Sequence, residues 1–134
     1  MNVEDAVLEM LATIDASVRR GDIAKTMEYV ADDVVHMPPD GPALIGKEAL
    51  SRWQKDFYGA FSLDMTHHAE ETNDCGELVV HRGMVTGTMT RKGTPESFPL
   101  NNKYLFLLRK EPDGRLKLWR AMFNSNVPAT QPQE

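Results

Sequence analysis

Residues 73–95 read NDCGELVVHRGMVTGTMTRKGTP, and this stretch decides the fold because it shows one long strand bounded by two turns. The turn signals are Asn73–Gly76 and Arg91–Pro95, which are rich in residues that favour turns. Residues 77–90 between them contain many β-branched and apolar side chains, which is typical of a strand. Two glycines lie inside this strand, and we expect them to mark bulges or bends that let a sheet curl.

The chain on either side of this stretch extends the same pattern. A further turn signal at residues 111–114 divides the second half of the chain. The expected long strands are 62–72, 77–90, 97–110 and 115–126. Their connections are too short for crossovers, so neighbouring strands must form antiparallel hairpins. A short β-favouring segment at residues 34–37 ends at two prolines and is expected to be the first strand of the sheet.

Three helices are expected before the long strands. The first runs from a cap at Asn2 to a stop at Gly21, with apolar residues at helical spacing between them. A second, shorter helix follows at once, and the third begins after Gly46. The expected buried face of the second helix consists of Ile23, Met27 and Val30. This order indicates the α+β class, with three N-terminal helices packed on a strongly curved, mixed but mostly antiparallel sheet.

The length of 134 residues allows one domain, which we expect to span residues 1–128 and to leave residues 129–134 as a disordered tail. The hydrophobic share of 41% and the charged share of 26% are those of a globular protein. The net charge of −5 argues against nucleic-acid binding. No apolar run is long enough to cross a membrane, which needs about 18 residues. Acidic residues near the first methionine and a single cysteine lead us to expect a cytoplasmic protein.

Several segments resemble one known family. They are Gly21-Asp22, Tyr29–Val35, Met37–Pro39, Gly46–Leu50, Lys103–Leu105, Asp113-Gly114 and Trp119–Asn126. Together they resemble the nuclear-transport-factor-2-like superfamily, in particular its SnoaL-like or ketosteroid-isomerase-like branch. The resemblance implies a cone-shaped α+β barrel, a pocket inside the cone and a dimer formed through the outer sheet face. It also implies isomerases, cyclases, epoxide hydrolases and dehydratases as relatives.

The catalytic acids of these relatives do not carry over to this chain. The position of the isomerases' aspartate base falls on Pro38, and the expected first helix contains no tyrosine for an oxyanion hole. The only acids between residues 79 and 126 are Glu96, Glu111 and Asp113, all at or near expected turns. The absence of these residues disfavours the mechanism of the steroid isomerases. The scarcity of acids also counts against the mechanism of the epoxide hydrolases, which, as the resemblance implies, need an Asp-Arg-Asp set.

Proton transfer would then depend on a histidine. His36 lies on the short strand that leads to the mouth of the family's pocket, and a neutral imidazole can act as a general base. The alternative is a hydrogen-bonded histidine with no catalytic role. His67 and His68 are adjacent on an expected strand and point to opposite faces, so they cannot chelate one ion. We expect neither a metal nor another cofactor.

Six further residues are candidates for contact with a small-molecule ligand in the same cavity. They are Met37, Trp53, Phe57, Lys103, Arg120 and Asn124. Trp53 and Phe57 share a helix face and would supply apolar contact, unless they are ordinary core residues. Arg120 and Asn124 share a face of the last strand and would orient a polar group of the ligand. The alternative is that Arg120 pairs with a helix carboxylate such as Asp15 or Asp56.

The opposite face of the last two strands is expected to be aromatic. Tyr104, Phe106, Trp119 and Phe123 would point outward, and such a surface is too apolar to leave in water. We therefore expect a homodimer through this face. The expected function is that of a small-molecule-pocket protein: an isomerase, cyclase or dehydratase acting on a small apolar or polyketide-like substrate. The alternative is a non-catalytic ligand-binding or dimeric assembly module, so the sequence leaves open whether the chain is an enzyme.

Overall fold

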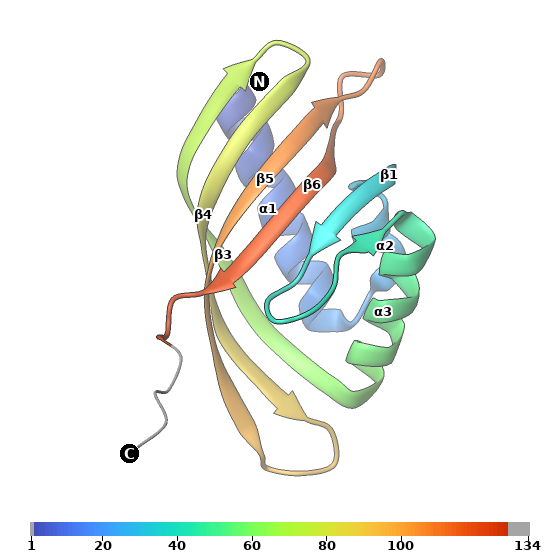
Figure 1. Ribbon diagram of the computed structural model, residues 1–134, viewed down its shortest axis with the longest axis vertical. Helices are drawn as coiled ribbons and strands as arrows, with labels where there is room; N and C mark the ends of the chain where they lie inside the picture. Colours follow the sequence, from blue (N-terminus) through green and yellow to red (C-terminus); the bar gives the residue numbers. More distant parts are fainter. Residues whose placement is uncertain (1, 129–134) are drawn as a thin grey trace.

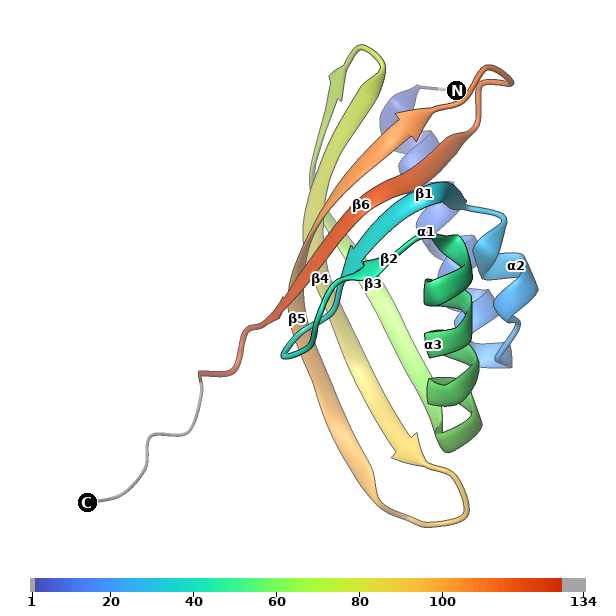
Figure 2. The ribbon, with the colours of Figure 1, turned by 45° about the vertical axis from the view of Figure 1, so that its right-hand side comes forward.

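The computed structural model describes residues 2–128 and shows a curved sheet with helices on one face (Figure 1; Figure 2). The helices are α1 (Val3–Arg20), α2 (Ile23–Met27) and α3 (Lys47–Ala60). The strands are β1 (Val30–Met37), β2 (Leu44–Ile45), β3 (Phe61–Cys75), β4 (Leu78–Arg91), β5 (Ser97–Lys110) and β6 (Leu116–Ser125). These elements confirm the α+β class with three N-terminal helices. The expected disordered tail, residues 129–134, lies outside the described residues.

The strands form one sheet in the order β2-β1-β6-β5-β4-β3. Neighbouring strands are antiparallel except β1 and β6, which are parallel, so the sheet is mixed but mostly antiparallel as expected. It curves strongly around the helices but stays open instead of closing into a barrel (Figure 2). Gly87 on β4 has a φ of +150°, and a Cβ there would collide with the carbonyl oxygen of Asp64 on β3. A glycine is therefore required where these two long strands bend together.

The helix ends follow local signals with one exception. Gly21 ends α1 in the left-handed conformation, with a φ of 67°. The second helix is shorter than expected, because it ends at Met27 and Val30 begins β1, opposite Leu118 on β6. The carbonyl oxygen of Tyr29 already accepts a hydrogen bond of 2.7 Å from the Leu118 N–H. Pairing with β6 and the β preference of valine thus end the helix early and lengthen the first strand.

The hydrophobic core lies between α1 and the concave face of the sheet. Its buried members include Val7, Met10 and Leu11 of α1 and Val79, Val85, Phe106 and Leu108 of the sheet. Burial of these side chains is the main force that holds the helices on the sheet. The core does not fill all of the space between the layers, and a cavity remains between α1, α3 and the sheet.

A bulge in β6 decides which side chains face the helices. Leu118 and Arg120 lie opposite consecutive residues of β5, so Trp119 is an extra residue between them. The alternation of side chains reverses at this point, because one inserted residue shifts the following residues to the other face. Leu118 before the bulge and Phe123 after it therefore both line the helix side, whereas Arg120 faces outward.

The expected aromatic outer face is therefore wrong. Tyr104 and Phe106 are each 3% exposed and belong to the core on the helix side, against which Phe123 also packs. Of the four expected aromatic residues, only Trp119 lies on the outer side. The outer face instead carries aliphatic side chains such as Met122, which is 50% exposed.

Candidate functional site

A cavity of about 380 Å³ lies between the helices and the concave face of the sheet. Its volume falls within the range of small-molecule sites, roughly 300–1,000 Å³. Most of its lining is apolar, including Met10, Leu50, Met65, Val85 and Phe106. The few polar side chains in its wall are therefore the ones that can carry chemistry.

His67 on β3 is a polar side chain of the wall, and it forms a buried pair with Asp15 on α1, which does not itself line the cavity. Asp15 Oδ1 lies 2.6 Å from His67 Nδ1, and Asp15 Oδ2 accepts a hydrogen bond of 2.9 Å from the His67 backbone N–H. The two side chains are 7% and 4% exposed, respectively. Because Nδ1 is engaged by the carboxylate, Nε2 is the ring nitrogen available to a ligand. A histidine held in one tautomer by a carboxylate is suited to general acid–base catalysis.

Neither member of this pair was expected in this role from the sequence. Asp15 lies within the apolar stripe of α1, four residues after Leu11 and three before Val18, both of which are buried. A carboxylate at a core position of a helix is a usable signal, because such a group needs a partner. His67 is 52 residues away along the chain, so no local spacing links the two residues.

A second polar network lies beside the pair. His81 Nε2 lies 2.8 Å from Tyr104 Oη, and His81 Nδ1 lies 2.9 Å from Thr72 Oγ1. The Tyr104 ring packs edge-on against His67, with 5.2 Å between ring centroids. Burial lowers the pKa of His81 and raises the pKa of Tyr104, so both side chains stay neutral near pH 7. This network fixes the wall behind His67.

His36, the base expected from the sequence, lies in the cavity wall on β1. Its ring packs between Trp53 and Phe123, with centroid distances of 5.9 and 5.1 Å. Burial lowers the pKa of His36 to about 4, because the apolar surroundings disfavour the charged form. His36 is therefore a neutral side chain at physiological pH.

Trp53 and Phe57 line the cavity from α3, where the sequence placed them. Their rings are stacked with centroids 5.3 Å apart, and Trp53 is 36% exposed, which places it at the edge of the cavity. Tyr58 and Asn102 also line the cavity and were not expected there. Burial raises the pKa of Tyr58 to about 12, so its hydroxyl remains a hydrogen-bond donor at neutral pH.

The other four expected ligand contacts are not brought to this cavity. They are Met37, Lys103, Arg120 and Asn124. Lys103 and Asn124 are cross-strand neighbours beside a shallow hollow on the outer face, and Lys103 Nζ donates to the Ser125 carbonyl oxygen at 3.1 Å. Met37 pairs with Met122 on the same outer face. The reversal at Trp119 explains the placement of Arg120 and Asn124, which would share the face of Leu118 if β6 had no bulge.

Arg120 is held by the backbone of the outer face. Its guanidinium lies 3.9 Å from the centre of the Trp119 ring and donates to the carbonyl oxygens of Asp33 and Trp119, at 3.1 and 2.9 Å. Asp15, one of the two carboxylates expected as alternative partners for Arg120, pairs with His67 instead.

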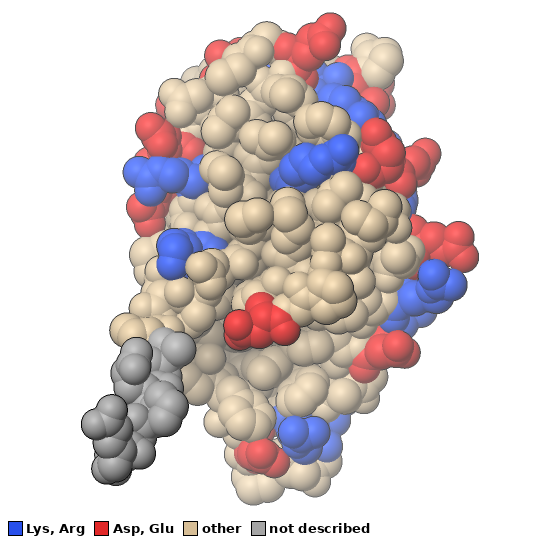
Figure 3. Space-filling view, in the orientation of Figure 1, with Lys and Arg blue, Asp and Glu red and all other residues tan. Residues whose placement is uncertain are grey.

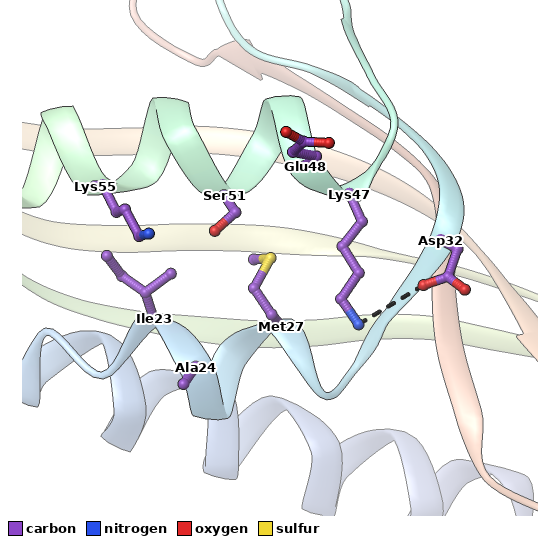
Figure 4. Close-up of a pocket in the computed structure, with 8 residues that line it drawn as sticks. All are labelled: Ile23, Ala24, Met27, Asp32, Lys47, Glu48, Ser51 and Lys55. Carbon is purple, nitrogen blue, oxygen red and sulfur yellow. Dashed lines mark ion pairs between the residues drawn. The ribbon is translucent and has the colours of Figure 1, made fainter.

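A separate groove lies between α2 and α3 on the outside of the helical layer (Figure 4). Ile23 of α2 lies across it from Lys55 of α3, and Met27 lies across it from Ser51. Lys47 Nζ lies 3.9 Å from Asp32 Oδ1, but the Asp32 side chain is 99% exposed, so water screens this ion pair. The charged groups of the groove face solvent, and the cavity with its buried acid–base pair is the better candidate site.

Among residues 2–128, no three His, Cys, Asp or Glu side chains are grouped so that they could hold a metal ion. A helix of the length and apolarity needed to span a membrane is also absent from this part of the chain.

Three helices on an open, curved sheet define the nuclear-transport-factor-2-like fold. The sequence profile of the SnoaL-like domain matches residues 9–123, and the chain belongs to this family. The resemblance noted from the sequence is thereby confirmed. No curated protein matches the chain significantly.

Three solved structures illustrate the similarity. A ketosteroid isomerase-like protein from Erwinia carotovora atroseptica is 26% identical, with 96% of this chain and 100% of that chain covered and a TM-score of 0.83. A protein from Novosphingobium aromaticivorans, provisionally named scytalone dehydratase, is 12% identical over 92% and 84% of the two chains, with a TM-score of 0.81. A provisionally named polyketide cyclase from Xanthomonas campestris is 22% identical over 91% of each chain, with a TM-score of 0.67. These similarities establish the fold.

Proposed function

We propose that this protein is an enzyme that transfers protons on a small, largely apolar substrate held in the cavity. The observation that carries this proposal is the buried Asp15–His67 pair, whose Oδ1 and Nδ1 atoms are 2.6 Å apart. The pair supplies a base, and the apolar cavity supplies a site for a carbon acid. Isomerases, cyclases and dehydratases all need such a step, and the names of the structural neighbours favour this group of reactions.

In the proposed step, His67 Nε2 removes a proton from a substrate carbon next to a carbonyl group. The electron pair of the broken C–H bond moves toward the carbonyl oxygen, and the Asp15 carboxylate stabilises the imidazolium that forms. Tyr58 and Asn102 are neutral donors in the cavity wall and can stabilise negative charge on that oxygen. A dehydratase would then give the proton to a leaving hydroxyl group as water, and an isomerase would return it to another carbon.

His36 is a weaker candidate for this base than His67. With a pKa of about 4, it is unprotonated at neutral pH but has little tendency to take up a proton. Its ring packs against the aromatic rings of Trp53 and Phe123, whereas His67 is oriented by a carboxylate. We therefore assign proton transfer to His67 and contact with the substrate to His36, Trp53 and Phe57.

A non-catalytic ligand carrier is the alternative function, and the apolar lining of the cavity favours it. Apolar burial contributes about 25 cal/mol per Å² whether or not a ligand reacts, so a carrier needs no base. In a carrier, the Asp15–His67 pair would only join α1 to β3.

Exchange of the α-protons of 2-tetralone in D₂O, followed by NMR, separates the two functions. The wild type should accelerate the exchange, and His67→Gln should lose the acceleration. His68→Gln is the matched control, because His68 is the exposed neighbour whose ring bonds Thr86, and it should retain the wild-type rate. Equal exchange by His67→Gln and the wild type would leave the carrier as the better description.

We also propose that two copies associate through the outer face of the sheet. Leu105 and Met122 are cross-strand neighbours on this face and are 46% and 50% exposed. In Figure 3, which looks onto this side of the molecule, most of the surface is uncharged, although an acidic and a basic side chain lie in its middle part. A surface with few charges and exposed aliphatic side chains suits a protein interface. Such a dimer leaves the cavity on the other face of each sheet.

A further inference from the structure

Two buried polar atoms in the cavity wall have no hydrogen-bond partner among the described residues. They are His36 Nδ1 and Gln54 Oε1. Their residues are 9% and 8% exposed, and both line the cavity. Native proteins contain few such atoms, because leaving a buried donor or acceptor unpaired is costly. Two of them in one cavity point to a polar ligand group that pairs with them.

These atoms and the acid–base pair come from different elements around the cavity. His36 is on β1, and Gln54 is on α3 next to Trp53, whose ring centroid lies 5.9 Å from that of His36. Asp15 and His67 are on α1 and β3. Three strands separate β1 from β3. At roughly 4.8 Å per strand, β1 and β3 lie about 19 Å apart across the sheet, measured along its surface.

We propose that Gln54 and His36 form a hydroxyl-binding subsite, so that the substrate is a neutral, mostly apolar molecule with a hydroxyl group bound there. The inference deepens the proposed function and rests on it, since it takes the cavity as the ligand site. A hydroxyl fits because it can both donate and accept a hydrogen bond. It therefore pairs with either end of the Gln54 amide and with Nδ1 of either His36 tautomer. A carbonyl or ether oxygen only accepts and cannot pair with the amide oxygen.

The surroundings of the subsite favour an uncharged ligand. None of the described residues that line the cavity is Lys, Arg, Asp or Glu. A charged ligand would lose its hydration there without gaining a counter-charge. Trp53 and Phe123 flank His36, and Phe57 stacks on Trp53. These aromatic rings favour a flat ring next to the hydroxyl group.

The test is calorimetric titration with 2-naphthol and with 2-methylnaphthalene, in which a methyl group replaces the hydroxyl. The wild type should bind 2-naphthol about tenfold more tightly, because only the hydroxyl satisfies the unpaired atoms. Gln54→Leu should reduce this ratio toward one, mainly by weakening 2-naphthol binding. Because Gln54→Leu removes a buried unpaired oxygen, the thermal midpoint of unfolding of this variant should equal or exceed that of the wild type. Met89→Leu, a volume-conserving change in the apolar wall, is the control and should keep the tenfold preference.

Equal affinity of the wild type for the two probes would overturn the subsite, and so would a preference that survives in Gln54→Leu. Either result would mean that ordered water alone pairs with the two atoms. The proposed function is tested separately, since His67→Gln should keep the tenfold preference while it loses proton exchange. Loss of exchange in that variant, together with equal probe affinities in the wild type, would overturn the subsite and keep the enzyme.

Discussion

A buried carboxylate needs partners for its oxygens, and Asp15 has both of its oxygens engaged by one residue. Oδ1 meets the His67 ring and Oδ2 meets the His67 backbone N–H, which together tie α1 to β3. An ionised carboxylate without such partners would be strongly destabilising in an apolar layer. The residue that orients the proposed base is thus also one that joins the helical layer to the sheet.

Replacement of Asp15 should therefore affect both stability and catalysis. Asp15→Asn keeps the size of the side chain but replaces the carboxylate by a neutral amide. The charge-assisted hydrogen bond from His67 Nδ1–H is then lost, and a ring that accepts from the amide instead is in the wrong tautomer for Nε2 to act as a base. The free energy of unfolding should fall by about 1–3 kcal/mol, and proton exchange should be lost as in His67→Gln. Urea unfolding at pH 7 measures the first effect. His68→Gln, a surface change, should stay within about 0.5 kcal/mol of the wild type, and an Asp15→Asn variant as stable as this control would contradict the pairing.

Burial of His36 predicts a loss of stability at mildly acidic pH. Its pKa is about 4 in the folded protein, against 6.5 for the unperturbed group. Between these values the unfolded chain binds a proton that the folded chain does not, so stability falls as pH decreases from 6.5 to 4. The full effect is on the order of 3 kcal/mol. Urea unfolding between pH 6.5 and 4 should show a smaller loss of the free energy of unfolding for His36→Leu than for the wild type. Equal slopes of this free energy against pH in the two proteins would contradict the lowered pKa of His36.

At the scale of elements, local signals predicted the strands, and long-range pairing decided which residues they present. The turns at residues 73–76, 91–95 and 111–114 placed the long strands within a few residues of their observed ends, because turn chemistry is local. The extra residue Trp119 was not predictable, since only pairing with β5 shows where a bulge falls. It sent Arg120 and Asn124 to the outer face. A carboxylate on a helix stripe can be seen in the sequence, but its partner on β3 cannot.

Gly83 on β4 is required by the close approach of β3 and by the polar network beside His67. A Cβ at this position would collide with the carbonyl oxygen of His68 and would lie 2.6 Å from Tyr104 Oη, the atom that bonds His81. Gly83→Ala should push β3 and the Tyr104 ring away from β4 and lower the free energy of unfolding by about 1–3 kcal/mol. Gly59→Ala is the matched control in α3, where nothing lies within 4 Å of the added Cβ. Gly59→Ala should raise the free energy of unfolding by about 0.5–1 kcal/mol. If urea unfolding showed that Gly83→Ala also gained stability, the close contact at Gly83 would be contradicted.

At the scale of the whole molecule, the helices cover only one face of the sheet (Figure 2). The covered face holds the cavity and the acid–base pair, and the uncovered face carries the exposed aliphatic side chains. The sequence predicted an apolar outer face but assigned the wrong residues to it, because aromatic side chains were expected outside and are needed in the core. The two faces can therefore act independently, one in ligand binding and the other in association.

Association through the outer face should be sensitive to one charge at its centre. Met122 is 50% exposed there, beside Leu105 and Met37, so an aspartate in its place would have to be buried without a partner in a dimer. Sedimentation velocity should show a dimer for the wild type and a monomer for Met122→Asp. Leu8→Asp is the matched control, because Leu8 is 52% exposed but lies on α1, in the layer on the other side of the sheet. A monomeric wild type, or dissociation by Leu8→Asp as complete as that by Met122→Asp, would show that the outer face is not the interface.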